Sequence, residues 1–241
     1  MKNTVAFGLI CLLFCTLLSC SSKNKETDDG ITREYWPNGN LHKEMKLVDG
    51  KMTGYYKSYY KEGGLFEEMN FVKGKREGIA KKYYESGILC EATSYKKGMR
   101  HGIMKRFRRT GELMSEIPYY QSNLCTGMKE YSTDGTVKKR YPTIQFKPNR
   151  DRLKDGAFIV DVSLSDGSLG VEYFEGVLTE QGYIPWNAKK LKNVEGGIGK
   201  LVLTVPKNSY LAKDLHIIAK VKTVQSNYYI TTATYEVFVE N

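Results

Sequence analysis

Five glycines at equal intervals constrain this chain more than any other feature of its sequence. They are 24 residues apart, with an aromatic residue four positions before each and a branched aliphatic residue two positions after each. The glycines are Gly39, Gly63, Gly87, Gly111 and Gly135. A fixed period of this length predicts a repeat architecture in which each unit packs against its neighbours.

Apolar and polar residues alternate after each repeated glycine. Leu65, Met69 and Phe71 share one parity, whereas Glu68 lies on the other, and a period of two predicts a half-buried β-strand. Before the glycine the alternation breaks, which a β-bulge would reconcile. We therefore predict one hairpin per unit, and a single-layer meander of about ten strands for the five units.

The basic residues concentrate in the repeats. The formal net charge is +10, with 22 basic and 13 acidic residues in 31–143 but 12 and 11 in 144–241. Basic and aromatic residues together suit an anionic membrane, an anionic glycan or a nucleic acid. The alternative is that the lysines and arginines keep an open sheet soluble and block edge pairing, while the tyrosines pack it. The candidate binding face comprises Tyr59, Tyr60, Tyr83, Tyr84, Arg106, Arg108 and Arg109.

The motif Y-x-x-x-G-x-L, followed by an aromatic residue and G-K-x-x-x-G, resembles the MORN-type repeat over residues 33–141. It is most similar to the bacterial variant family often labelled as antitoxins of toxin–antitoxin pairs. The resemblance implies an open β-meander that acts as a scaffold, a dimerisation surface or a lipid-binding element. The label implies an alternative function, an antitoxin or immunity-type protein that neutralises a toxin by stoichiometric binding.

The N-terminus resembles a bacterial lipoprotein signal peptide. Lys2 precedes an apolar run that ends at Leu17-Leu18-Ser19-Cys20, and the run is short for a membrane span. The resemblance implies that residues 1–19 are removed and that Cys20 is acylated and anchors the chain in the cell envelope, at the outer membrane, facing the periplasm or the cell surface. An uncleaved signal anchor is the alternative, and both exclude the cytoplasm.

Residues 20–30 are expected to form a flexible tether, because residues 21–30 contain no apolar side chain. The acidic cluster in this segment is similar to the signals that send Bacteroidetes lipoproteins to the cell surface. The repeat domain is predicted at 31–143, and a second domain at 144–241, where the 24-residue period disappears.

The second domain is predicted to be an antiparallel β-sandwich, which makes the whole chain all-β. Alternating and β-branched segments follow one another with Asp-Gly and Gly-Gly turns between them. Trp186 is expected to fill the core, since large aromatic side chains in small sandwiches are usually buried. The Gly196–Lys200 stretch is interpreted as a turn of the sandwich and not as a phosphate-binding loop.

The sequence contains no recognisable catalytic or metal-binding motif. His42, His101 and His216 have no partner at metal-ligand spacing, so we expect no metal and no cofactor. Cys90 and Cys125 are expected to be free thiols, because their positions in the repeat place them too far apart for a disulfide. A hydrolase in the second domain would need a cleft lined by Asp161, Asp166 or Glu172, and it ranks last among the hypotheses.

The preferred interpretation is a non-catalytic envelope lipoprotein that is not an enzyme. Its repeat module would bind a protein or an anionic glycan or lipid, with the sandwich docking or presenting it. No nucleic acid partner is expected, because export separates the protein from nucleic acid.

Overall fold

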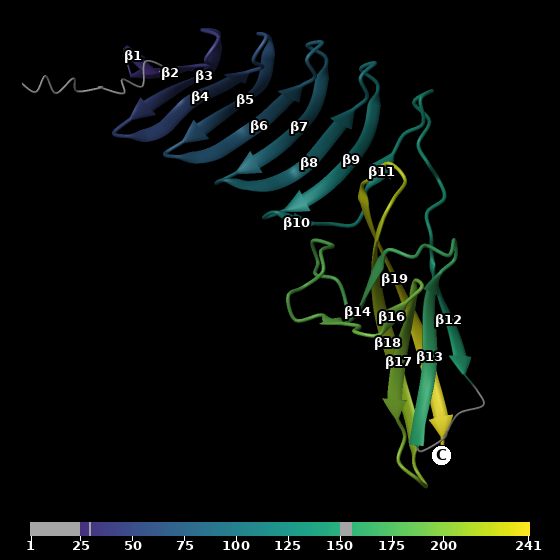
Figure 1. The fold of residues 1–241 in the computed structure, drawn as a ribbon. Helices are drawn as coiled ribbons and strands as arrows, with labels where there is room; N and C mark the ends of the chain where they lie inside the picture. The colour runs from purple at the N-terminus through teal and green to yellow at the C-terminus, as the bar shows by residue number, and fades with distance from the viewer. Residues whose placement is uncertain (1–24, 29, 150–155) are drawn as a thin grey trace, which may run out of the picture.

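The computed structural model describes residues 25–28, 30–149 and 156–241. The leader, Cys20 and the first part of the tether lie outside these ranges. The described residues form strands, turns and loops in three antiparallel sheets, which confirms the all-β prediction. No helix long and apolar enough to span a membrane occurs among them. In Figure 1 a large repeat sheet, purple to teal, meets two smaller sheets near β9 and β11.

The repeat sheet is a meander in which each strand from β1 to β10 pairs with the next. Strands of eight residues and of nine residues alternate from β3 to β9, and each kind recurs every 24 residues. This confirms the predicted hairpin repeat. The strands are β1 (Lys25–Asp28), β2 (Ile31–Tyr35), β3 (Leu41–Val48), β4 (Lys51–Tyr59), β5 (Leu65–Val72), β6 (Lys75–Tyr83), β7 (Leu89–Lys96), β8 (Met99–Phe107), β9 (Leu113–Tyr120), β10 (Asn123–Leu124) and β11 (Lys129–Glu130).

The predicted bulges are present in the first strand of the hairpins. Opposite the preceding strand, β4 advances four residues, from Met52 to Tyr56, against two on β3, and β6 and β8 do the same against β5 and β7. A second register shift, at Ser58/Tyr59, Lys82/Tyr83 and Arg106/Phe107, has its extra residue on the second strand. Tyr60 and Tyr84, which come directly after this second shift, reach the following repeat. The Tyr60 hydroxyl donates to the carbonyl of Tyr83 at 2.6 Å, and the Tyr84 hydroxyl donates to that of Phe107 at 2.7 Å. These bonds tie each repeat to its neighbour.

Tight turns join the hairpins to one another. Lys97 and Gly98 have φ of 52° and 88°, and two successive left-handed residues form the type I′ turn that suits the twist of a two-strand hairpin. The next such turn is Gln121-Ser122, with φ of 48° and 69°. Left-handed backbone without glycine is strained, and the regular repeat ends just beyond this turn.

The fifth copy of the repeat departs from the predicted meander. Both β10 and β11 pair with β9, so they are one strand interrupted at residues 125–128. The turn at Gly135 forms, but in place of two paired strands it is flanked only by an isolated β-bridge between Tyr131 and Val137. A full fifth hairpin is absent because the chain leaves the sheet here and enters the second domain.

The sheet also begins earlier than expected. Lys25–Asp28, assigned from the sequence to a flexible tether, forms β1 and pairs with β2 along its whole length. An edge strand needs only backbone hydrogen bonds to its neighbour, so the lack of apolar side chains does not prevent its pairing.

The second domain packs two four-stranded sheets face to face, which confirms the predicted sandwich. One sheet has the order β12-β13-β17-β16 and the other β15-β14-β18-β19. The strands are β12 (Ile144–Asn149), β13 (Ala157–Leu164), β14 (Val171–Glu175), β15 (Lys189–Lys190), β16 (Val194–Glu195), β17 (Ile198–Thr204), β18 (Tyr210–Lys222) and β19 (Tyr228–Glu240). Val160 and Val162 of one sheet and Leu215 and Ile217 of the other are fully buried in one core.

Two local predictions for the sandwich had different outcomes. Gly196 and Gly197, with φ of 55° and 77°, form the predicted turn between β16 and β17. The prediction that Trp186 fills the core is wrong, because its side chain is 97% exposed in the loop between β14 and β15. Tyr173 fills the core instead, and its hydroxyl donates to the Gly197 carbonyl at 3.0 Å. This bond satisfies the polar end of a buried aromatic ring.

Candidate functional site: a basic cleft between the domains

A cleft of about 640 Å³ lies where the repeat sheet meets the turn of the β18–β19 hairpin. Met104 and Ile117, both buried, belong to its sheet side, and we call the sheet face that carries them the inner face. Ser226, Asn227 and Tyr228 contribute from the hairpin. We call this space the basic cleft, since its charged lining residues are Arg76, Lys82, Arg100, Arg106 and Glu91.

Arginine and tyrosine alternate along one row of the cleft. The Arg76 guanidinium lies 5.2 Å from the centre of the Tyr95 ring, and its Nη1 donates to the Tyr95 hydroxyl at 3.3 Å. The Arg100 guanidinium lies 4.1 Å from the centre of the Tyr119 ring. Stacking orients a guanidinium while leaving in-plane N–H donors available for an anion. Burial raises the pKa of the Tyr119 hydroxyl, which therefore stays neutral at physiological pH.

The other charged row crosses three neighbouring strands in register. Lys82 of β6 lies opposite Glu91 of β7 in the strand register, and Glu91 in turn lies opposite Arg106 of β8. The Glu91 carboxylate accepts a hydrogen bond from the Thr93 hydroxyl. Nη1 of Arg106 donates to Asn227 Oδ1 at 2.7 Å, so this cation also holds the hairpin against the sheet.

The charges that line the basic cleft are unbalanced. Four cationic side chains face one carboxylate, and across the residues that the structure covers none of the four forms an ion pair with a carboxylate. By contrast, Lys81 and Lys105, on the opposite face of the same strands, pair with Glu68 and Glu116. Like charges that converge in a walled cleft create a positive potential that attracts anions.

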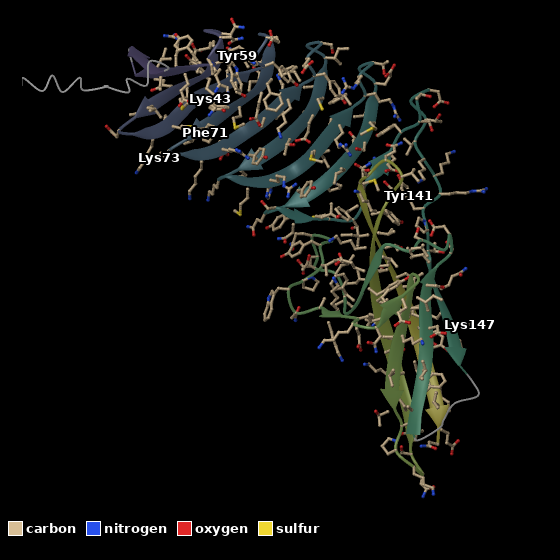
Figure 2. All side chains as sticks on the ribbon, viewed as in Figure 1. Lys43, Tyr59, Phe71, Lys73, Tyr141 and Lys147 are labelled. Carbon is tan, nitrogen blue, oxygen red and sulfur yellow. The ribbon has the colours of Figure 1, made fainter. Side chains whose placement is uncertain are left out.

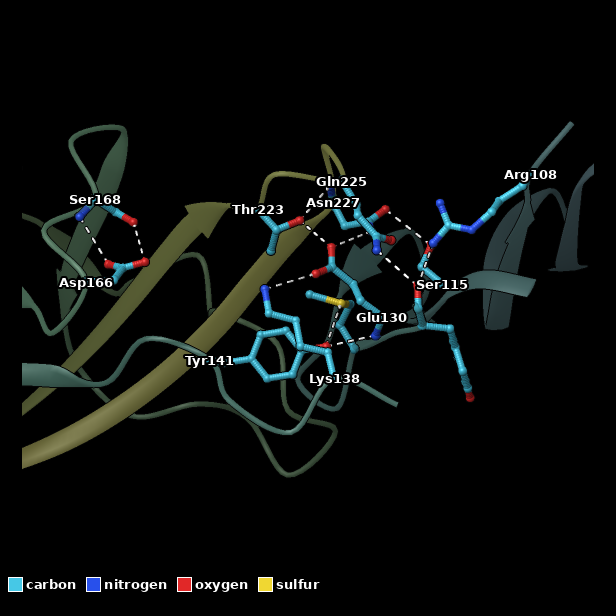
Figure 3. A network of polar contacts seen from close by, with 12 residues as sticks. Arg108, Ser115, Glu130, Lys138, Tyr141, Asp166, Ser168, Thr223, Gln225 and Asn227 are labelled. Atoms are coloured by element: carbon cyan, nitrogen blue, oxygen red, sulfur yellow. Dashed lines mark hydrogen bonds and ion pairs between the residues drawn. The ribbon is translucent and has the colours of Figure 1, made fainter. Parts of the chain in front are cut away.

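A buried polar network fixes the hairpin to the repeat sheet (Figure 3). Glu130 is fully buried, and its carboxylate accepts hydrogen bonds from the Thr223 hydroxyl and, at 2.8 Å, from Asn227 Nδ2. Lys138 Nζ lies 3.4 Å from its other oxygen, and the Ser115 hydroxyl donates to Asn227 Oδ1 at 3.3 Å. A buried carboxylate is tolerated only when it is paired and hydrogen-bonded, so the network sets the position of the hairpin beside the cleft.

The tyrosines of the predicted binding face lie outside the basic cleft. Tyr59 and Tyr60 line a separate hollow of about 400 Å³ together with Trp36, and Tyr59 lies near the upper rim of the sheet in Figure 2. The Tyr83 hydroxyl donates to Glu68 at 2.6 Å. Burial and this hydrogen bond raise the pKa of Tyr83 to about 12, and the same bond lowers the pKa of Glu68. Internal bonds thus engage the hydroxyls of Tyr60, Tyr83 and Tyr84.

Of the three predicted arginines, Arg109 lies apart from the other two. Arg106 and Arg108 both reach the turn of the β18–β19 hairpin: Arg106 Nη1 donates to the Gln225 carbonyl at 3.3 Å, and Arg108 Nη2 donates at 2.6 Å to the Tyr131 carbonyl, which also accepts from Gln225 Nε2. Arg109 lies instead over the Tyr84 ring at 5.1 Å. The seven predicted residues therefore share no single surface, and Arg106 alone lines the basic cleft.

The remaining predicted residues occupy unrelated places. The His42 ring packs against the Trp36 ring at a tilt of 32° with ring centres 3.7 Å apart, and Nδ1 of His216 lies 3.0 Å from the Thr234 hydroxyl. Cys90 and Cys125 are free thiols. Among the described residues, no group of three His, Cys, Asp or Glu side chains could hold a metal ion.

The acidic residues considered for hydrolysis do not converge. Asp161 lies on β13 and Glu172 on β14, which belong to different sheets, and Asp166 accepts hydrogen bonds from Ser168 in a turn. Hydrogen bonds from Lys190 and Lys220 lower the pKa of Glu172, so this carboxylate is ionised and would not serve as a proton donor near neutral pH.

Comparison with known families identifies the repeat. Four consecutive segments match the MORN repeat variant: residues 28–49, 52–73, 76–97 and 100–120. The repeat sheet is built from MORN repeat variants. All four cations of the basic cleft lie in the third and fourth MORN repeats, and Arg76 and Arg100 occupy the first position of each.

Comparisons over the whole chain add little. No curated protein sequence matches it significantly. A solved structure with some likeness is the crystal structure of TarM, at a TM-score of 0.29 and 13% sequence identity over 49% of this chain. The match spans 22% of the TarM chain, and a likeness at this level supports no conclusion.

The sequence contains a pattern that could have identified the cleft residues. Arg76 and Arg100, Tyr95 and Tyr119, and Lys82 and Arg106 are each separated by 24 residues. Reading the repeats column by column, rather than searching for runs of adjacent basic residues, finds these pairs. The 24-residue spacing does not show that a hairpin of the second domain lies beside these residues and closes one side of the cleft.

Proposed function

We propose that this protein is a non-catalytic lipoprotein of the cell envelope whose MORN repeat module binds an anionic partner in the basic cleft. The observation that carries the proposal is the set of four cationic side chains around the cleft, none of them ion-paired with a carboxylate among the described residues. The MORN repeats supply a repeat-based binding surface, and the hairpin of the sandwich turns part of that surface into a cleft.

The anchor belongs to the same proposal. Cys20 follows an apolar leader and a small residue, and acyl chains on this cysteine would hold the chain at the outer membrane. Cys20→Ser should release unprocessed protein from the membrane fraction. A Cys20→Ser protein that is processed and retained as before would refute the lipid anchor.

Binding can be tested with the full-length chain in detergent and three anionic probes: polygalacturonate, polyglutamate and phosphatidylglycerol vesicles. We expect at least one probe to bind, and the affinity to fall as salt rises, because the Debye length shortens to about 8 Å at physiological ionic strength. The combined variant Arg76→Gln, Lys82→Gln and Arg100→Gln should abolish binding. It leaves Arg106 in place, because that side chain holds the hairpin.

Arg140→Gln is the matched control, since Arg140 is exposed and does not line the cleft. Failure of all three probes would refute the proposed function. A stoichiometric complex with a protein toxin that survives high salt and the cleft substitutions would instead support the antitoxin alternative.

A further inference from the structure

The basic cleft contains the same group of side chains twice. Arg76, Tyr95 and Lys82 form one set, and Arg100, Tyr119 and Arg106 form the other, with every member 24 residues from its equivalent. In both sets the arginine lies over the tyrosine ring, with its guanidinium carbon 5.2 Å from the ring centre in the first set and 4.1 Å in the second. The duplication is confined to these repeats, because the positions of Arg76 and Arg100 hold Met52 and Leu124 in the flanking units.

The two sets are one repeat apart along the sheet. One repeat contributes two strands, and neighbouring strands are ~4.8 Å apart, so equivalent atoms are about 10 Å apart. A ligand that uses both sets must therefore present two anionic groups at about this spacing. A polymer of identical acidic units does so naturally, because its charges recur at a regular interval as the side chains do here.

The surroundings favour a polyhydroxylated chain over a peptide. The cleft floor lies on strands β6 to β9, each hydrogen-bonded to a strand on both sides, so no free sheet edge is available to extend with a peptide strand. The polar groups on offer besides the charges include the hydroxyls of Tyr95, Tyr119, Ser122, Ser226 and Tyr228. Such side chains suit the hydroxyl groups of sugars.

A flat bilayer fits the cleft less well. Ser226, Asn227 and Tyr228 of the hairpin lie beside the same space as the sheet cations, and Asn227 is held there by Arg106 and Glu130. A wall of this kind admits a single chain from solution and obstructs a planar surface.

We infer that the basic cleft binds a linear acidic polysaccharide, with two carboxylates of one chain in the two equivalent arginine–tyrosine subsites. This inference rests on the proposed function and adds the ligand class and the two-point mode of binding. Arginine suits the role because its planar guanidinium binds a carboxylate through two parallel hydrogen bonds.

The test measures the affinity of the full-length chain for galacturonic acid as the monomer, the dimer, the tetramer and the hexamer. Once the oligomer is long enough to reach both subsites, the second contact becomes intramolecular, and affinity should rise by about tenfold or more over the monomer. Arg76→Gln and Arg100→Gln should each return the tetramer to the affinity of the monomer, and the double variant should bind neither. Arg140→Gln should keep the gain with length.

The outcomes separate this inference from the proposal on which it rests. Binding that is independent of oligomer length, or a gain that survives both single substitutions, would refute the two-subsite arrangement and leave an anion-binding cleft. Tighter binding of oligoglutamate with the same number of charges, or of phosphatidylglycerol vesicles, would refute the polysaccharide. The lack of binding to any anionic probe would refute the proposed function itself.

Discussion

The repeat sheet and the sandwich reach stability in different ways. The sandwich has one continuous core, in which Tyr173, Leu215, Ile217 and other side chains are fully buried between two sheets. The repeat sheet is a single layer with two small clusters on its inner face, one around Met69 and Phe71 and the other around Met104 and Ile117. Side-chain bonds to the carbonyl of the next repeat supplement these clusters. A single layer with few apolar contacts leaves both faces open to solvent, which suits a binding surface.

The largest effect is expected in the core of the sandwich. Leu215→Ala should lower the free energy of unfolding by about 2–5 kcal/mol, because it leaves a cavity among fully buried side chains. Chemical denaturation measures this change, with Val202→Ala, an exposed position on β17, as the control. Equal losses at the two positions would contradict the assignment of the core.

The junction of the two regions should respond next. Glu130→Ala should cost about 1–3 kcal/mol, because it leaves Asn227 and Thr223 with unmet hydrogen bonds in a buried site. Hydrogen exchange at increasing denaturant concentration can follow each region separately, with the amides of β7 reporting the repeat sheet and those of β13 reporting the sandwich. The two transitions should separate in Glu130→Ala and not in the exposed control Glu180→Ala. Unseparated transitions would show that this network does not couple the domains.

The repeat turns require glycine because of their backbone conformation and not because a side chain would clash there. A Cβ at Gly87 would meet no atom within 4 Å, but its φ is +82°, so Gly87→Ala should cost about 1 kcal/mol from conformational strain alone. A Cβ at Gly170 is equally unobstructed, and its φ lies outside the left-handed range. Thermal unfolding should show a loss at Gly87 and none at Gly170, and equal shifts would contradict this explanation.

The bonds between repeats make a smaller contribution. Tyr84→Phe removes the hydroxyl that donates to the Phe107 carbonyl and should cost about 0.5–1.5 kcal/mol. Tyr210→Phe, at a tyrosine of the sandwich that is 70% exposed, is the matched control. If Tyr84→Phe unfolds at the same denaturant concentration as the control, these bonds do not stabilise the sheet.

The smallest expected effect is the loss of the stabilising hydrogen bond between Tyr83 and Glu68 in acid. The hydrogen bond from Tyr83 lowers the pKa of Glu68 in the folded chain, so the pair stabilises the fold above the unfolded-state pKa of about 4.3. That contribution is lost as pH falls through the folded value. Unfolding measured at pH 7 and pH 3 should show that Tyr83→Phe is less stable than the unsubstituted chain only at pH 7. A difference that persists at pH 3 would assign the effect to packing.

The period of the sequence specifies most of the repeat sheet. Alternation predicts the strands, the break in alternation before each glycine predicts a bulge in the first strand, and the glycines predict turns with positive φ. Each of these features depends on residues within one repeat or its neighbour. The Gly196-Gly197 turn follows in the same way, because its conformation is encoded in two adjacent residues.

The tertiary structure alone decides where the two domains touch. Glu130 and Asn227 are 97 residues apart in the chain, yet they share a buried network, and the hairpin that this network holds converts part of an open sheet into the basic cleft. The same distinction explains Trp186, whose place in the core is taken by Tyr173, since burial depends on which residues the opposing sheet presents. Turns and strand periodicity are encoded by backbone conformation over a few residues. Docking, burial and the convergence of charge depend on contacts between distant segments, which no local pattern of residues specifies.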